Sequence, residues 1–223
     1  TVLPEYKILN AILLGLTLLA VAAPAAQAQM SKKQAKKLHK ALAKEAKKAI
    51  KEAEAKGYYE MPGALPLSTQ MNESYRMQMQ MDEEGYPKFI VGEAAAIGGT
   101  KIAAKNQAME AAKLELAGKI ESNIVALVEQ SIANEQLTQE DAASITETVT
   151  ASKNIISKKL GLVRPLVEAY RDVGKENVEA LVRIAYDKEM AEQVSINTIK
   201  EELKKKSEDL HQKLDNLLNL SGN

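Results

Sequence analysis

The 223-residue chain contains no cysteine, no tryptophan, one phenylalanine and two histidines. Without cysteine it can form no disulfide, no thiolate-bound zinc or iron–sulfur cluster, and no thiol nucleophile. Histidine-dependent chemistry has only His39 and His211 to use. Basic and acidic residues number 30 each, so the formal net charge is zero. This balance excludes a uniformly basic nucleic-acid binder, and we expect no nucleic-acid partner.

An apolar run of 16 residues occupies positions 8–23, after Lys7 and before Ala26-Gln27-Ala28. A short apolar core followed by a small-x-small site predicts a secretory signal peptide over residues 1–28, cleaved after Ala28. The alternative is an uncleaved N-terminal anchor, although the run is shorter than the roughly 20 residues that span a bilayer. We expect a periplasmic or cell-envelope protein of a Gram-negative bacterium that is not integral to the membrane after cleavage. No cysteine is present to carry a lipid anchor.

Charge is strongly segregated after this point. Residues 29–56 carry ten lysines and three glutamates, whereas residues 57–223 carry 19 basic and 26 acidic residues. The Ala/Lys-rich composition of residues 29–56 predicts a helix. Leu38, Leu42, Ala46, Ile50 and Ala53 recur on one face of that helix.

One interpretation is a basic amphipathic helix that contacts an anionic surface, such as lipid headgroups, cell-wall polymer or an acidic protein. The alternative is a solvated helix that lies on the acidic remainder of the chain. The candidate surface-binding residues are Lys32, Lys33, Lys36, Lys37, Lys40, Lys44, Lys47 and Lys48.

The remaining chain is predicted to be a linker over residues 57–73 and an α+β domain over residues 74–223. Alternation over residues 74–81 and an apolar stretch over 86–96 predict a first β-hairpin. Helices are expected over residues 101–134, after Thr100 as a cap, and over 138–161. A second hairpin over 165–173 and 177–187 precedes a helix over 188–220. The predicted order is α-ββ-α-α-ββ-α, with an antiparallel sheet covered by helices on one face.

Met77, Met79 and Met81 alternate in the first predicted strand, which would place three thioethers on one face. Thioethers suit Cu(I), so a periplasmic copper or small-ligand carrier is the alternative function. Methionine packing in a core explains the same pattern. No catalytic motif and no converging carboxylate pair can be identified, and we predict a non-enzymatic protein without a cofactor.

The glycine-containing strand end and the Ala104-x3-Ala108-x3-Ala112 spacing over residues 91–132 resemble the LPP20-type lipoprotein family. The segment ENVEALVRIAYD at 176–187 is similar to that family's closing strands. The lysine-rich start and residues 62–67 also resemble uncharacterised exported proteins of Bacteroides-type bacteria. The resemblance implies an α+β envelope domain, in some members part of outer-membrane or flagellar assemblies, and it implies no catalytic residues. We therefore expect a binding or scaffolding protein of the cell envelope, whose partner is a protein or the envelope surface.

Overall fold

The computed structural model describes residues 32–83, 86–161 and 163–221. The signal peptide predicted over residues 1–28 lies outside these ranges. The described elements are α2 (Lys32–Ala55), α3 (Leu67–Gln78), β1 (Phe89–Gly98), α4 (Lys101–Ala133), α5 (Gln139–Lys159), β2 (Pro165–Val173), β3 (Asn177–Asp187), α6 (Lys188–Lys206) and α7 (Glu208–Ser221). The three strands form an antiparallel sheet in the order β1-β3-β2, so the predicted α+β class is confirmed.

Long periodic segments fold as the sequence predicts. Strands β2 and β3 form the second hairpin with the predicted bounds. Helix α4 begins after Thr100, whose side chain accepts a hydrogen bond from the backbone N–H of Ala103 at 3.1 Å. Thr138 caps α5 in the same way through the N–H of Asp141. Each cap satisfies a backbone donor that the first helical turn leaves without a partner.

The first predicted hairpin is wrong, because residues 74–78 belong to α3 rather than to a strand. Leu67, Gln70, Met71 and Ser74 are buried at helical spacing, and this pattern outweighs the alternation that follows it. Methionine and glutamine are also good helix formers. The predicted linker therefore ends where α3 begins at Leu67. An isolated bridge between Met81 and Pro87 is what remains of the hairpin.

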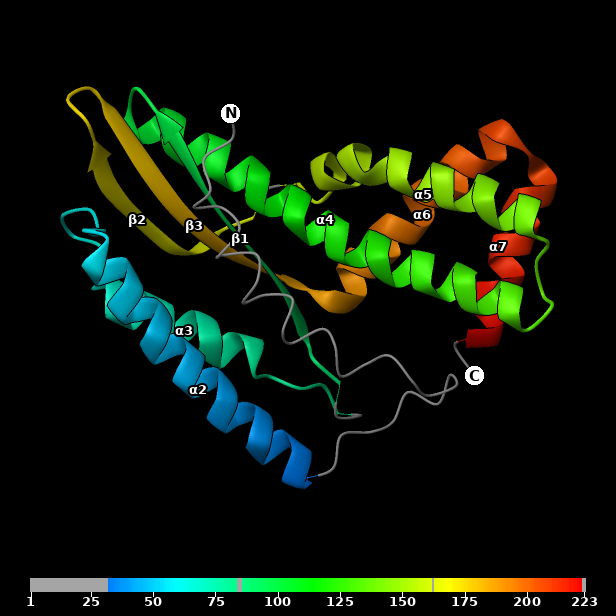
Figure 1. Ribbon diagram of the computed structural model, residues 1–223, viewed down its shortest axis with the longest axis horizontal. Helices are drawn as coiled ribbons and strands as arrows, with labels where there is room; N and C mark the ends of the chain where they lie inside the picture. Colours follow the sequence, from blue (N-terminus) through cyan, green and yellow to red (C-terminus); the bar gives the residue numbers. More distant parts are fainter. Residues whose placement is uncertain (1–31, 84–85, 162, 222–223) are drawn as a thin grey trace.

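Helices cover both faces of the sheet, not one (Figure 1). Side chains of β3 alternate between two cores, since successive strand residues point to opposite faces. Ala180, Val182 and Ile184 join the larger core with α4, whereas Leu181 joins a smaller core with Met71 of α3. The smaller core also includes Ala53 of α2, Leu67, Val167 and Ala169. The α2–α3 pair is thus an outer layer on the sheet face opposite α4.

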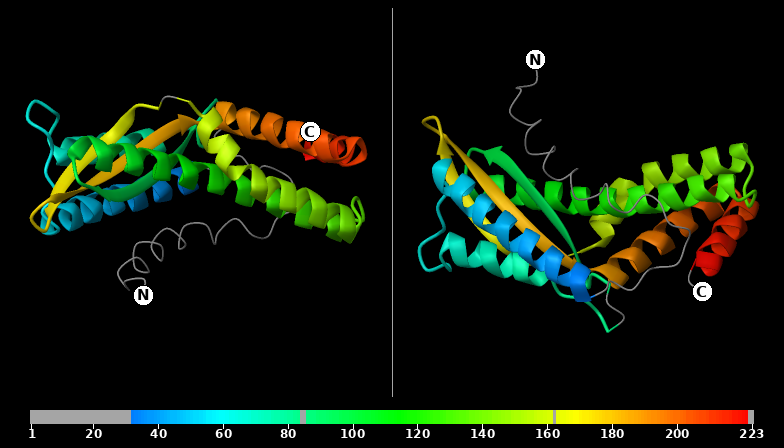
Figure 2. Two further views of the ribbon diagram at one scale, coloured as in Figure 1. Left: turned by 90° about the horizontal axis from the view of Figure 1, so that it is seen from above. Right: turned by 60° about the horizontal axis from the view of Figure 1, so that its bottom comes forward.

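Beyond the sheet, the second half of α4 packs with α5, α6 and α7 in a helical extension (Figures 1 and 2). The sequence predicts one helix over residues 188–220, but the chain is extended at Ser207 and starts α7 there. The Ser207 hydroxyl accepts the N–H of Leu210 at 3.4 Å, which makes it a cap between two helices. Leu203, Leu214 and Leu217 are buried in the larger core. This part of the chain therefore packs on its own domain.

Candidate anionic-surface interface on helix α2

The apolar stripe of α2 is occupied by its own domain. Leu42, Ala46 and Ala53 are only 3–4% exposed. Helix α2 packs along α3, and Ile50 and Ala53 contact the smaller core. The stripe therefore anchors α2 and is not available for insertion into a membrane while α2 remains docked.

The lysines of α2 point away from the stripe. Of the eight predicted surface-binding residues, six have exposed side chains, and the side chains of Lys32 and Lys33 lie outside the described residues. The exposed residues are Lys36, Lys37, Lys40, Lys44, Lys47 and Lys48, together with Lys51, which the sequence-based selection missed. We call these seven the lysine face. At about 3.6 residues per turn they fall within an arc of about 120°, centred opposite Leu42, Ala46 and Ala53.

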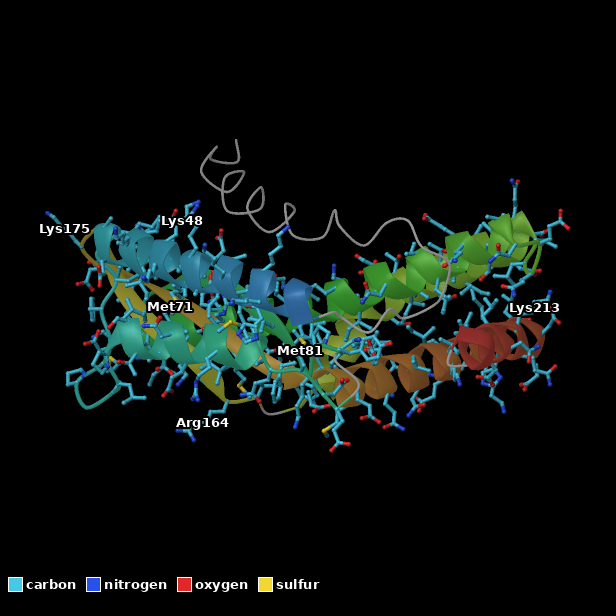
Figure 3. All side chains as sticks on the ribbon, turned by 90° about the horizontal axis from the view of Figure 1, so that it is seen from below. Lys48, Met71, Met81, Arg164, Lys175 and Lys213 are labelled. Atoms are coloured by element: carbon cyan, nitrogen blue, oxygen red, sulfur yellow. The ribbon has the colours of Figure 1, made fainter. Side chains whose placement is uncertain are left out.

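Within the described residues, most of the lysine face has no counterion. Lys48 lies 3.6 Å from Glu52, and among the described residues no other member of the lysine face forms an ion pair. Figure 3 shows Lys48 on the outer side of α2. The alternative of a solvated helix that lies on the remainder of the chain agrees with the docking of α2 on α3, and it is the apolar stripe that makes the contact while the lysines are exposed. From Lys36 to Lys51 the face extends about 22 Å, at roughly 1.5 Å per residue.

A buried arginine attaches the α2–α3 layer to the sheet. The Arg183 side chain of β3 is 6% exposed, and its Nη1 donates to Glu93 of β1 at 2.9 Å. Its Nη2 donates to Gln78 of α3 at 2.6 Å, and its guanidinium lies over the ring of Tyr75. Burial is the main cause of the raised pKa of Tyr75, and the positive charge of Arg183 partly offsets it.

A second ion pair lies on the same sheet face. Arg171 of β2 pairs with Glu179 of β3, and the Arg171 guanidinium lies 5.3 Å from the centroid of the Tyr58 ring. Burial and the nearby Glu179 carboxylate raise the pKa of Tyr58 well above its usual value. Tyr58 lies three residues after the end of α2, so this contact ties the chain that leaves the helix to the sheet.

The segment between α2 and α3 is also bonded to the edge of β2. The N–H of Tyr59 donates to the carbonyl of Tyr170 at 2.7 Å, and the N–H of Tyr170 donates back at 2.8 Å. Gln70 of α3 accepts the N–H of Glu168 at 2.8 Å. Backbone and side-chain bonds thus hold both ends of this segment, so α2 is presented on a fixed support.

The three methionines of the alternative copper site do not share a strand face. Met77 lies in α3, Met79 is its C-cap residue, and Met81 lies in the isolated bridge with Pro87. The side chains are all half-buried. These positions therefore do not form the shared strand face that the proposed thioether site requires. No cluster of histidine, aspartate and glutamate suited to a metal occurs in the described ranges.

Two surface hollows lie away from α2. One, of about 380 Å³, lies between α5 and α6 and is lined by Thr148, Ser152, Ile155 and the Glu147–Lys206 ion pair. The other, of about 690 Å³, lies between residues 81–83 and 86–88 and the start of α6, and its lining includes five acidic and two basic residues. Neither lining includes a histidine.

No model of a protein family, no curated protein and no solved structure matches this chain. Within the described residues, no helix has both the length and the apolarity needed to cross a bilayer. The resemblance to the LPP20-type family remains a prediction from the sequence.

Proposed function

We propose that this chain is a non-enzymatic, exported envelope protein that binds an anionic surface through the lysine face of α2. The observation that carries the proposal is the separation of the two sides of that helix. Its apolar side is docked on α3, while seven lysines lie on the solvent side with one ion pair among them. A fixed row of ammonium groups attracts phosphate and carboxylate groups by charge.

The predicted mode of binding is electrostatic and superficial. Because the apolar stripe of α2 is buried, binding does not require the helix to leave the domain. Lysines close to an anionic lipid surface contribute about 1 kcal/mol each, and this attraction falls off within about 10 Å at moderate salt. The rest of the domain acts as a scaffold that positions the lysine face.

Co-sedimentation with anionic vesicles and with purified cell wall tests the proposal. The first variant replaces Lys36, Lys37, Lys40, Lys44, Lys47 and Lys48 with glutamine. The matched control replaces six exposed lysines elsewhere, namely Lys158, Lys159, Lys175, Lys204, Lys205 and Lys206. Both variants lose the same charge, and the control lysines lie outside α2, where four of them, Lys159, Lys204, Lys205 and Lys206, form ion pairs.

The proposal predicts that the wild-type protein and the control are retained and that the α2 variant is released. Retention on vesicles alone would identify lipid headgroups as the surface, and retention on cell wall alone would identify the polymer. Equal retention of both variants, or no retention of the wild-type protein on either material, would exclude this role for α2.

A further inference from the structure

The connection between α2 and α3 contains a run of exposed residues without charge. Residues 61–66 read Met-Pro-Gly-Ala-Leu-Pro, and each of the six is exposed. The two large side chains among them, Met61 and Leu65, are 36% and 55% exposed. We call residues 61–66 the apolar loop. Single exposed apolar side chains are normal on a protein surface, but contiguous ones mark an interaction site.

The other exposed large apolar residues of the described chain are separate from one another. They are Ile97, Ile102, Ile155 and Met190. The two that are nearest in sequence, Ile97 and Ile102, have the charged Lys101 between them. Among the described residues, Met61 and Leu65 are therefore the one pair of such side chains that no charged residue separates.

The first half of the apolar loop is a tight turn. The N–H of Ala64 donates to the carbonyl of Met61 at 3.0 Å, and Gly63 has a φ of 84°. Together with Pro62 before the glycine, these are the features of a type II turn. The turn bonds part of the loop backbone internally, so fewer of its polar groups need water.

The second half of the apolar loop is held by α3 and β2. The Nε2 of Gln70 donates to the carbonyl of Leu65 at 2.6 Å, while its Oε1 accepts the N–H of Glu168 at 2.8 Å. The Glu60 carboxylate, next to the loop, accepts the N–H of Leu67 at 3.3 Å. The exposed side chains thus project from an ordered support, which lowers the entropic cost of binding.

We propose that the apolar loop enters the headgroup region of an anionic lipid bilayer while the lysine face lies on the bilayer surface. This inference rests on the proposed function and selects lipid as the anionic surface. The loop begins six residues after α2 ends at Ala55. Figure 1 shows it in cyan at that end of α2, within the layer opposite α4. A planar surface along α2 therefore meets the loop at the end of the helix.

A bilayer offers the two environments that this layer requires. Its anionic headgroups attract the ammonium groups of the lysine face, and its headgroup–acyl boundary accepts apolar side chains. A hydrated cell-wall polymer offers the anions without an apolar phase. Because the apolar loop has no charged residue, its entry into the boundary requires no charge to lose its water.

Co-sedimentation with anionic vesicles at several salt concentrations separates the two contributions. A double variant with Met61→Ser and Leu65→Ser removes the apolar side chains and keeps every charge. Its affinity should fall about tenfold at each salt concentration, since the loss of a buried leucine has an effect of that order. The variant without the α2 lysines should instead show a flatter salt dependence.

The matched control is a double variant with Ile102→Ser and Met190→Ser. These residues are 73% and 57% exposed and lie outside the α2–α3 layer, so the control should bind vesicles like the wild-type protein. Equal affinity of the Met61/Leu65 variant and the wild-type protein would overturn loop insertion and leave the lysine face as the binding surface. Retention of the wild-type protein on cell wall and not on vesicles would overturn it as well, with the polymer then bound by the lysine face.

Fluorescence locates the apolar loop directly, because the chain has no tryptophan. The emission of Leu65→Trp should shift to shorter wavelength on anionic vesicles and be quenched by bromine atoms on the lipid acyl chains. Met190→Trp, at the start of α6, should show neither change. An unchanged emission of Leu65→Trp on vesicles that retain the protein would show that the loop stays in water, and would overturn the inference.

Discussion

The guanidinium carbon of Arg183 lies 4.0 Å from the centroid of the Tyr75 ring. This contact joins the central strand to α3, in a layer where Arg183 also bonds to Glu93 and Gln78. A charged residue thus takes the place that an apolar contact would usually have between a helix and a sheet. Arg183 fixes the position of α3 on the sheet, and the hydrogen bonds to Glu93 and Gln78 keep the buried Arg183 side chain in place.

Glu93→Gln should destabilise the protein strongly. It removes the carboxylate that neutralises Arg183, whose side chain is 6% exposed, and an uncompensated buried charge is costly. We expect the free energy of unfolding to fall by about 3 kcal/mol in urea titrations. The exposed Glu73→Gln on α3 is the control and should change it by less than about 0.5 kcal/mol. Equal effects of the two substitutions would contradict the role given to Glu93.

Gly92→Ala should be poorly tolerated because α4 approaches β1 very closely there. A Cβ on Gly92 would overlap the backbone carbonyl of Ala112, which cannot move like a flexible side chain. Overpacking of this kind costs about 1–3 kcal/mol. Gly99→Ala meets nothing within 4 Å and is the matched control. Thermal unfolding should show a clearly lower midpoint for Gly92→Ala alone, and a shared midpoint would show that α4 can move away from β1.

Acid should weaken the contact between α5 and α7 through Asp141. Hydrogen bonds from Lys213 of α7, at 2.8 Å, and from Thr138 hold the pKa of Asp141 below its usual value. A lowered pKa means that the carboxylate contributes stability at neutral pH, and that this contribution is lost as the pH falls through the folded-state pKa.

Asp141→Asn should therefore lower the free energy of unfolding at pH 7 by at most about 1 kcal/mol, the upper range for an ion pair at the protein surface. The difference from the wild-type protein should shrink as the pH is lowered through the acid range. Urea unfolding at several pH values measures this directly. A difference that stays constant from neutral to acidic pH would show that Asp141 acts by packing and not by charge.

Much of the architecture could be predicted because it depends on long, periodic segments. Helix α4 repeats small and apolar residues every four positions from Ala104 to Ile124, and each of these is buried. The β2–β3 hairpin turns at Gly174, whose φ of 67° suits glycine. Helix α3 was missed because methionine and polar residues alternate in its last turn. Such a short alternation is typical of a strand, although the same residues can also form a helix. The helix is favoured by the burial of Leu67 and Met71 against Leu181 and Val167, which come from distant parts of the sequence.

The lysines of α2 could be predicted, but their direction could not. Whether they face solvent or the acidic domain depends on which surface α3 offers to Leu42 and Ala46, and no local pattern contains that information. The role of Arg183 was also missed. The sequence does indicate that Glu179 and Arg183 share a face of β3, because they are an even number of residues apart in a strand.

The most direct test of the account is the affinity for the anionic surface, measured as a function of salt. The wild-type protein should bind whichever material retains it in the co-sedimentation assay, anionic vesicles or cell wall. Its affinity should fall steeply as the salt concentration rises. The variant with Lys36, Lys37, Lys40, Lys44, Lys47 and Lys48 replaced by glutamine should bind at least about tenfold more weakly at low salt, with a flatter salt dependence. Equal affinity and equal salt dependence in the two proteins would contradict the claim that α2 is the binding surface.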